Sequence, residues 1–330
     1  MNSIRIAFLL LVFPLWVRAD DTLMTLGAGG LQPVKATQIS MQSEDLEISV
    51  HQIRVRFVFR NDSDKDIESL VAFILPGLNG GDLFNTPISI PKENAWNFMD
   101  FHVTEHEKEI ATKIEARAVD GERDITEHLR SLGLSPMPFP DVVAANIKKL
   151  PLGNRNQLKK EGLITNDESP SDEPEKYWWA TWTMNVRYYW TQRFPARSTV
   201  ELVQTYRPIV GGTYLPYGSD VREYLNPYCG RIEALRQIAA FLKNHPVKQQ
   251  GDNYLGEHTV DYVLTTAHNW AGPIGHFRLS VVTDTSEDIL VTCMPGLKRV
   301  SPTRYELTKD NFRPTGDLKL LILQQWKDQQ

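Results

Sequence analysis

The densest grouping of side chains that could do chemistry lies in the last quarter of the chain. It consists of His258, Asp261, His268 and His276. Imidazole and carboxylate groups bind metals and transfer protons, so neighbouring strands that brought these residues together would create a metal or acid–base site. Histidines scattered over a surface are the more ordinary explanation. We keep the group as an alternative polar site.

Specific catalytic motifs are absent from the chain. It has no GxSxG or HExxH sequence and no GxxxxGK[ST] phosphate loop. Asp62, Asp64 and Asp66 have the opening spacing of a calcium loop, but Ile67 replaces its glycine and Phe73 its glutamate. A glycosidase carboxylate pair cannot be selected from 41 acidic residues. We therefore predict no cofactor and no metal, and an enzyme is less favoured than a binding protein.

The most distinctive segment is the aromatic run from Tyr177 to Thr191. Every second residue in it is apolar, which predicts a long half-buried strand with a bend or bulge. The predicted core face consists of Trp178, Ala180, Trp182, Met184, Val186, Tyr188 and Trp190.

The opposite face of this strand is a candidate ligand-binding surface. It carries aromatic rings and polar groups, namely Tyr177, Trp179, Asn185, Arg187 and Tyr189. Sugar rings stack on such surfaces, and aromatic and arginine side chains are also enriched at protein interfaces. The alternative is that a second layer, such as the helical middle segment, covers this face.

The N-terminus has the composition of a secretory leader. Arg5 precedes an apolar run from Ile6 to Val17, which is too short to cross a bilayer, and Ala19 suits a signal peptidase. We predict cleavage after Ala19, a mature chain in the periplasm, and no membrane span after the leader is removed.

The two cysteines and the charge fit an exported protein. An even count in an oxidising compartment predicts a disulfide between Cys229 and Cys293. A metal pair or a thiol nucleophile is less favoured because neither cysteine lies in a CxxC motif or near a histidine. Loss of Arg5 and Arg18 with the leader takes the formal charge from −5 to about −7. This acidic balance argues against nucleic acid as a partner.

Hydrophobic alternation predicts a mainly β or α+β fold. We expect Ile53–Phe59 and Ile67–Leu75 to form a hairpin around a polar turn, and Phe101–Ile110 to pair with Thr112–Val119. Further strands are predicted at residues 199–206, 259–265, 276–284, 289–293, 304–307 and 318–323. Helices are predicted at residues 125–132, 141–150, 154–161 and 231–244. The acidic segment 165–176 predicts an exposed linker.

These elements divide the chain into three parts. Residues 1–19 are the leader, residues 20–212 an antiparallel β-sandwich-like domain with a helical insertion at about 121–176, and residues 213–330 a smaller α+β domain. The alternative is one continuous unit, because residues 211–217 make a short boundary.

Several of these segments resemble a known family. The sequences Gly27-Ala28-Gly29-Gly30-Leu31, Ser43-Glu44-Asp45-Leu46, and Arg54 to Asn61 followed by Ser63 to Asp66 are similar to an exported bacterial family catalogued as domain of unknown function 4424. The likeness covers most of the mature chain. It implies a periplasmic protein of a Gram-negative bacterium and implies no activity.

The sequence thus favours a non-enzymatic periplasmic binding or interaction protein. Its ligand would be an envelope glycan or a protein partner. The alternative is a hydrolase acting on cell-envelope material, with the group from His258 to His276 or an unrecognised carboxylate pair as its site. A purely structural envelope protein is the third interpretation.

Overall fold

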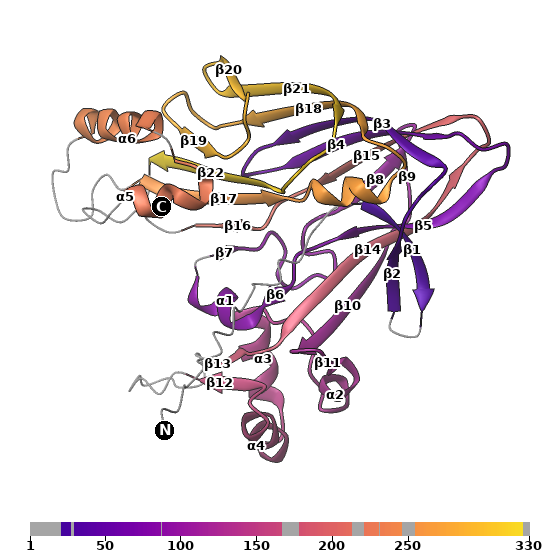
Figure 1. Cartoon of the computed structure of the whole chain (residues 1–330). Coiled ribbons are helices and arrows are strands. Elements are labelled where there is room, and N and C mark those ends of the chain that lie inside the picture. Colours follow the sequence, from indigo (N-terminus) through magenta and orange to yellow (C-terminus); the bar gives the residue numbers. More distant parts are fainter. Residues whose placement is uncertain are drawn as a thin grey trace, which may run out of the picture.

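The computed structural model describes residues 21–27, 30–86, 88–166, 178–212, 221–230, 232–245 and 255–325. In this part of the chain the strands form three large sheets and one two-stranded ribbon (Figure 1). The prediction of a mainly β or α+β fold is confirmed. The predicted leader with its cleavage site, and residues 167–176 of the predicted linker, lie outside the described residues.

A seven-stranded sheet contains the predicted aromatic strand. Its strand order is β11-β10-β14-β5-β1-β2, and β6 also pairs with β14. The strands are β1 (Asp21–Gly27), β2 (Gly30–Val34), β5 (Ile67–Ile74), β6 (Leu78–Asn79), β10 (Lys113–Asp120), β11 (Arg123–Asp124) and β14 (Thr183–Phe194).

An eight-stranded sheet packs against the first one. Its strand order is β20-β21-β18-β3-β4-β15-β8-β9. The strands are β3 (Ile39–Ile48), β4 (Ile53–Asn61), β8 (His102–Glu105), β9 (Lys108–Glu109), β15 (Thr199–Tyr206), β18 (Ile274–Val282), β20 (Lys298–Ser301) and β21 (Arg304–Phe312). Strand β18 runs parallel to β3, whereas the other pairs in this sheet are antiparallel.

The third sheet has five strands, in the order β19-β22-β17-β16-β7. They are β7 (Ile88–Ser89), β16 (Val210–Gly211), β17 (Leu255–Tyr262), β19 (Ile289–Thr292) and β22 (Leu318–Gln325). The two-stranded ribbon consists of β12 (Ile164–Asn166) and β13 (Trp178–Ala180).

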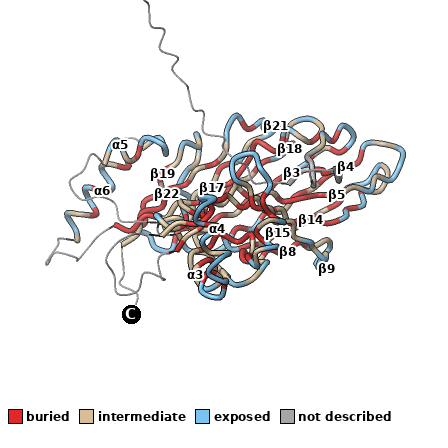
Figure 2. The backbone as a smooth tube through the Cα atoms, turned by 90° about the horizontal axis from the view of Figure 1, so that it is seen from below, coloured by how far each residue is buried: buried red, intermediate tan, exposed pale blue. Residues whose placement is uncertain are grey.

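The main core lies between the seven- and eight-stranded sheets. Alternate residues of β14, from Met184 to Phe194, are all buried, and those from Met184 to Trp190 are the predicted ones. Apart from Gln192, they share one hydrophobic cluster with alternate residues of β4, such as Phe57 and Phe59. Figure 2 shows the buried residues running along the strands and the exposed ones gathered at turns. The predicted sandwich is thus two sheets packed face to face through their apolar faces.

The predicted bend in the aromatic strand occurs at Thr181 and Trp182. These residues separate β13 from β14, and the Thr181 N–H donates to the Leu163 carbonyl at 3.1 Å. The chain before the bend therefore pairs with β12 instead of continuing in the seven-stranded sheet. The long predicted strand is broken because its first part, β13, pairs with β12, whereas its second part, β14, pairs with β10 and β5.

The predicted hairpin of Ile53–Phe59 with Ile67–Leu75 is wrong. Strand β4 pairs with β3 and β15, whereas β5 pairs with β14 and β1. The polar turn between them carries the chain from one sheet to the other. The fully buried Asn61 side chain holds this crossover, since its Nδ2 donates to the carbonyls of Lys65 at 2.8 Å and Phe194 at 2.9 Å.

Replacing Asn61 with Ala should lower the free energy of unfolding by about 2–3 kcal/mol, because the buried hydrogen bond to the Phe194 carbonyl and the partly buried one to the Lys65 carbonyl are both lost. The Asn61 Oδ1 also accepts from the Ser63 N–H at 2.9 Å and hydroxyl at 2.8 Å. The matched control in the same turn is Asp64→Ala, which breaks an exposed ion pair with Arg197 and should cost less than about 1 kcal/mol. Urea unfolding measures both; equal effects would contradict this role of Asn61.

The second predicted strand pair is also wrong. Strand β8 forms a short hairpin with β9 and pairs along its whole length with β15 in the eight-stranded sheet. Strand β10 instead pairs with β14 in the seven-stranded sheet. Residues 101–110 and 112–119 are therefore consecutive in sequence but belong to opposite layers of the sandwich.

The predicted helical insertion forms a unit at one end of the seven-stranded sheet (Figure 1). It contains α2 (Thr126–Ser131), α3 (Pro140–Lys149) and α4 (Leu152–Lys160), close to the predicted ranges. A separate hydrophobic cluster joins these helices to β12 and β13. Trp182 belongs to this cluster, and its indole N–H donates to the Pro136 carbonyl at 2.9 Å. The tryptophan thus anchors the helical unit to the start of β14.

The C-terminal part packs helices on the outer face of the five-stranded sheet. They are α5 (Val221–Leu225), the 3-10 helix η2 (Asn226–Tyr228) and α6 (Ile232–Asn244), the last of which is the predicted amphipathic helix. In β22, Leu321 and Leu323 face this outer cluster, whereas Leu320 and Ile322 face the main core. A second 3-10 helix, η3 (Thr265–Asn269), follows β17.

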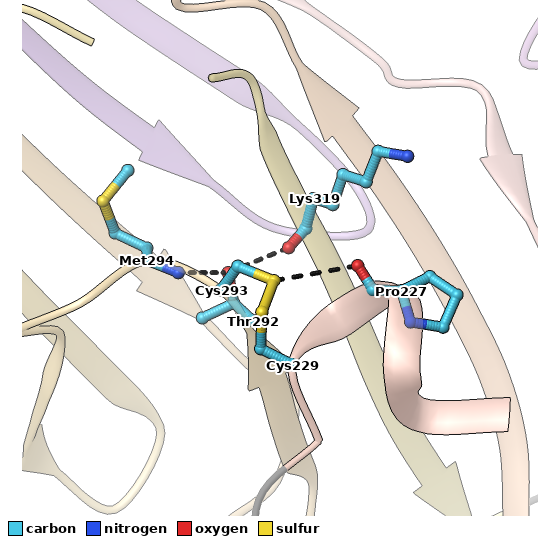
Figure 3. Close-up of a disulfide and its surroundings, with 6 residues drawn as sticks. All are labelled: Pro227, Cys229, Thr292, Cys293, Met294 and Lys319. Atoms are coloured by element: carbon cyan, nitrogen blue, oxygen red, sulfur yellow. Dashed lines mark hydrogen bonds between the residues drawn. A yellow bond between two sulfur atoms is a disulfide. The ribbon is translucent and has the colours of Figure 1, made fainter. Parts of the chain in front are cut away.

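The predicted disulfide joins Cys229 to Cys293. It connects the segment after η2 to the residue that follows β19 (Figure 3). Beside it, the Thr292 hydroxyl donates to the Lys319 carbonyl at 2.8 Å and ties β19 to β22. The bridge therefore fastens the helical layer to the strands on which it packs.

The predicted parts on either side of residue 212 share sheets. The eight-stranded sheet combines β3, β4 and β15 with β18 and β21, and the five-stranded sheet combines β7 and β16 with the C-terminal strands. The main core likewise contains residues from both parts. None of the helices that the structure describes is long and apolar enough to cross a membrane.

Candidate functional site

A pocket of about 720 Å³ lies where the start of β14 meets the end of β17 and the start of β22. We call it the junction pocket. Its polar side chains are Asn79, Asp82, Thr183, Asn185, Asp261, Asp317 and Lys319. Figure 1 shows β6 and α1 (Gly80–Asn85), which contribute to one wall, below β17. Binding sites for small ligands commonly have volumes of about 300–1,000 Å³.

Helix α1 fixes one wall of the junction pocket. Asn79 caps this helix, because its Oδ1 accepts from the N–H groups of Gly81 at 2.9 Å and Asp82 at 3.2 Å. The Asn79 Nδ2 donates to the Thr183 hydroxyl at 3.1 Å. At Gly80 an added Cβ would lie 2.3 Å from the Ala180 carbonyl oxygen, so only glycine allows this close approach. The amide and the hydroxyl are thus held in place without a ligand.

Two carboxylates on the opposite wall differ in their surroundings. The Asp317 Oδ1 accepts from the Leu264 N–H at 3.3 Å and from the N–H and hydroxyl of Thr265 at 3.1 and 2.7 Å. Asp261 takes part in none of the hydrogen bonds or ion pairs formed among the described residues. Asp317 therefore holds the chain after β17, whereas the Asp261 carboxylate is available to a ligand.

The pKa of Asp261 is raised above its ordinary value of 3.8. Desolvation by burial is the main cause, the positive charge of Lys319 opposes it, and the negative charge of Asp317 adds to it. The residue as a whole is exposed. A carboxyl group with these properties can accept a hydrogen bond when ionised and donate one when protonated.

The stability of the protein should depend on pH through Asp261. Because the folded-state pKa is the higher one, the contribution of Asp261 is fully present below pH 3.8 and is lost as the pH rises through the folded pKa. The loss should disappear in Asp261→Asn. Urea unfolding of both proteins at a series of acidic pH values measures it. A wild-type protein that gains stability relative to the variant as the pH rises would contradict the sign.

The structure separates the residues of the predicted binding face. Trp179 stacks on Phe84, with ring centroids 4.1 Å apart, and only Asn185 lines the junction pocket. The Arg187 Nη1 pairs with Glu115 at 2.6 Å, and both side chains are largely buried. Tyr189 lines a second, smaller pocket of about 380 Å³ beside α2. Tyr177 lies outside the described residues.

The residues of the alternative polar site have different neighbours. His276 pairs with Asp310 at 2.7 Å, whereas His268 is exposed on η3. Burial lowers the pKa of His258, against the charges of two nearby aspartates. Asp261 alone of this set lines the junction pocket. Over the described ranges, no group of three or more histidine, cysteine, aspartate or glutamate side chains could hold a metal ion.

The comparison with protein families gives one match that covers most of the chain. A family model described as "Domain of unknown function (DUF4424)" matches residues 19–321. The chain belongs to the DUF4424 family. The resemblance of the segments from Gly27 to Asp66 to this family is thereby confirmed.

The DUF4424 chain was also compared with curated proteins and solved structures. No curated protein matches it. Among solved structures it resembles a Legionella pneumophila protein described as a "putative nutrient binding protein", with 18% sequence identity and a TM-score of 0.41. The match covers 92% of this chain and 72% of that one. At this TM-score the likeness carries no argument about the ligand of the DUF4424 protein.

Sequence reasoning missed most of the pocket walls of this DUF4424 protein. Asn79, Asp317 and Lys319 were not candidates, and the sequence offers a local signal only for Asn79. The run Asn79-Gly80-Gly81 is a helix-capping pattern, which indicates a helix start without indicating a pocket. The junction pocket instead unites Asn185 from one predicted site with Asp261 from the other.

Proposed function

We propose that the protein is a non-enzymatic periplasmic binding protein whose ligand is an envelope glycan held in the junction pocket. The observation that carries the proposal is the convergence of side-chain amides, a hydroxyl, carboxylates and an ammonium group on one open pocket of about 720 Å³. Sugar hydroxyls both donate and accept hydrogen bonds, so they match this mixture of groups. A protein partner is the other ligand that the sequence leaves open.

The walls of the junction pocket are arranged before a ligand arrives. Asn79 and Thr183 hold each other, and Asp317 is held by the backbone of the chain after β17. A ligand would therefore lose little affinity to the ordering of these side chains. Asn185 is half-exposed at the start of β14 and is the wall residue that a ligand can reach from the predicted binding face.

The charge of the junction pocket favours a neutral or cationic glycan. Asp82, Asp261 and Asp317 contribute three carboxylates, whereas Lys319 contributes the one ammonium group among the described residues of its lining. An anionic sugar would meet repulsion from Asp261, for which no hydrogen-bond donor compensates in the described part of the chain. We therefore expect acidic sugars to bind less tightly than their neutral counterparts.

Export supports the periplasmic part of the proposal. Two observations support export. The first is the leader pattern in the sequence of residues 1–19, and the second is the disulfide between Cys229 and Cys293 in the structure. Disulfides persist in oxidising compartments such as the periplasm. The expected mature N-terminus is Asp20, and N-terminal sequencing of the exported protein tests it.

Filling the junction pocket should abolish glycan binding. We expect Asn185→Trp to weaken binding of N-acetylglucosamine-containing oligosaccharides at least about tenfold, because the indole occupies space in the junction pocket that Asn185 lines. Thr191→Trp is the matched control, since Thr191 is exposed on the same face of β14 and does not line the junction pocket. Calorimetric titration of the mature protein measures both variants. Equal affinities for the two variants would contradict the proposed site.

One observation favours a second function, a hydrolase acting on cell-envelope material. Asp261 has a raised pKa and lies near the carboxylate of Asp317, and glycosidases use one carboxyl group as an acid beside a second carboxylate. Incubation of the protein with the same oligosaccharides distinguishes the functions. Release of shorter sugars by the wild-type protein, abolished in Asp261→Asn, would favour the hydrolase.

A further inference from the structure

Another cavity adjoins the junction pocket and has the opposite character. It has a volume of about 280 Å³ and is lined mainly by apolar side chains, including Phe73, Leu78, Ile88, Met99 and Ile209. We call it the apolar annex. Strands β7 and β16 each contribute a residue to its lining, Ile88 and Gly211.

The two cavities share part of their walls. Pro76, Asp261 and Tyr262 line both of them. Asp261 and Tyr262, at the end of β17, therefore lie at the boundary between a polar compartment and an apolar one. A single molecule could place hydroxyl groups on one side of this boundary and a hydrocarbon group on the other.

The inner wall of the apolar annex belongs to the main core. Phe73, Met99, Tyr206 and Tyr262 are buried there, with exposed fractions of 5% or less. Leu78, Ile88 and Ile209 are only partly buried and pack against the same core. A hydrocarbon group in the annex would cover the exposed surface of these three side chains, which favours binding through removal of apolar surface from water.

We infer that the natural ligand is an amphipathic glycoside, with a neutral or cationic sugar in the junction pocket and an apolar substituent in the apolar annex. The inference rests on the proposed function and adds a substrate class to it. Three features of the annex indicate an apolar substituent attached to the sugar. They are the wall shared with the junction pocket, the apolar lining and the small volume of the cavity. A free hydrophilic sugar would leave the annex unfilled.

Titration with methyl and hexyl β-glycosides of glucose and N-acetylglucosamine tests the inference. Each methylene that enters the annex should tighten binding roughly two- to fourfold, so the hexyl glycoside should bind at least about thirtyfold more tightly than the methyl glycoside. Hexyl glucuronide should bind more weakly than hexyl glucoside, because three aspartates and one lysine line the junction pocket and repel its carboxylate. Isothermal calorimetry below the micelle concentration of each glycoside gives the affinities.

Two variants locate the alkyl chain. Ile88→Trp fills the annex, and Thr86→Trp covers its rim from an exposed position, so that folding is retained in the second case even if it fails in the first. Both should bring the hexyl affinity down to that of the methyl glycoside. Ser89→Trp is the matched control, because Ser89 is exposed on β7 and lines neither cavity.

The outcomes separate the inference from the proposed function. Methyl and hexyl glycosides that bind equally, with both affinities lost in Asn185→Trp, would overturn the inference and leave the proposed function standing. A chain-length effect that survives in Ile88→Trp and Thr86→Trp, or tighter binding of the glucuronide, would also overturn the inference. No binding of any glycoside at millimolar concentration would overturn both.

Discussion

Replacing Cys229 and Cys293 together with Ser should lower the free energy of unfolding by about 4 kcal/mol. The bridge closes a loop with a sequence separation of 64 residues, and the loss of unfolded-chain entropy in a loop of this length gives that magnitude. The native structure loses little, since the α6 layer keeps its apolar contacts with Leu321 and Leu323. Urea unfolding of the mature wild-type and double-variant proteins measures the difference.

Reduction provides the control for this effect. A reducing agent should destabilise the wild-type protein by the same amount and should leave the double variant unchanged. A double variant as stable as the oxidised wild-type protein would show that the bridge contributes nothing to the folded state. A variant that is destabilised and still responds to the reducing agent would point to an effect other than loss of the bridge.

Trp190→Ala should lower the free energy of unfolding by about 3–5 kcal/mol, which is the usual cost of removing a large aromatic side chain from a core. Trp190 is 2% exposed and belongs to the main hydrophobic cluster between the two large sheets. The indole fills space between β14 and residues such as Phe101 of the opposite layer. The remaining cavity would be lined by aromatic rings that cannot all move to fill it.

The adjacent residue supplies the matched control. Tyr189 is half-exposed on the other face of β14, against Met24 and Ala72, so Tyr189→Ala should cost less than about 1.5 kcal/mol. Chemical unfolding of the two variants compares the two faces of one strand. Equal costs would contradict the assignment of even-numbered residues to the core.

The local features of the fold could be predicted from the sequence because they depend on neighbours in the chain. The alternation from Trp178 to Trp190 determines which face of the strand is buried, and the pattern from Ile232 to Asn244 determines a helix with one apolar side. Both features follow from the period of the secondary structure and the removal of apolar side chains from water.

The partners of the strands could not be predicted in the same way. Strands β4 and β5 each have an apolar face, and alternation does not state which strand lies beside which. The turn from Asn61 to Asp66 looks like a hairpin turn in the sequence. In the structure the Asn61 amide binds Phe194, and that contact depends on a strand far along the chain.

The candidate site depends even more on distant contacts. Asn185 and Asp261 were each candidates for a different reason, and they line one pocket only because the start of β14 and the end of β17 meet. Trp179 was a candidate for stacking on a sugar ring, but Phe84 of α1 stacks on it. The sequence identifies the residue types, whereas the packing of the sheets decides which of them share a cavity.

The most direct test of ligand binding in the junction pocket is an amide chemical-shift titration of the isotope-labelled mature protein with hexyl N-acetylglucosaminide. We expect the largest shifts at Asn79, Asn185, Asp261 and Lys319, with further shifts at Ile88 in the apolar annex. Shifts confined to Arg187, Tyr189 and the neighbouring outer face of β14, with none at Asp261, would contradict the account.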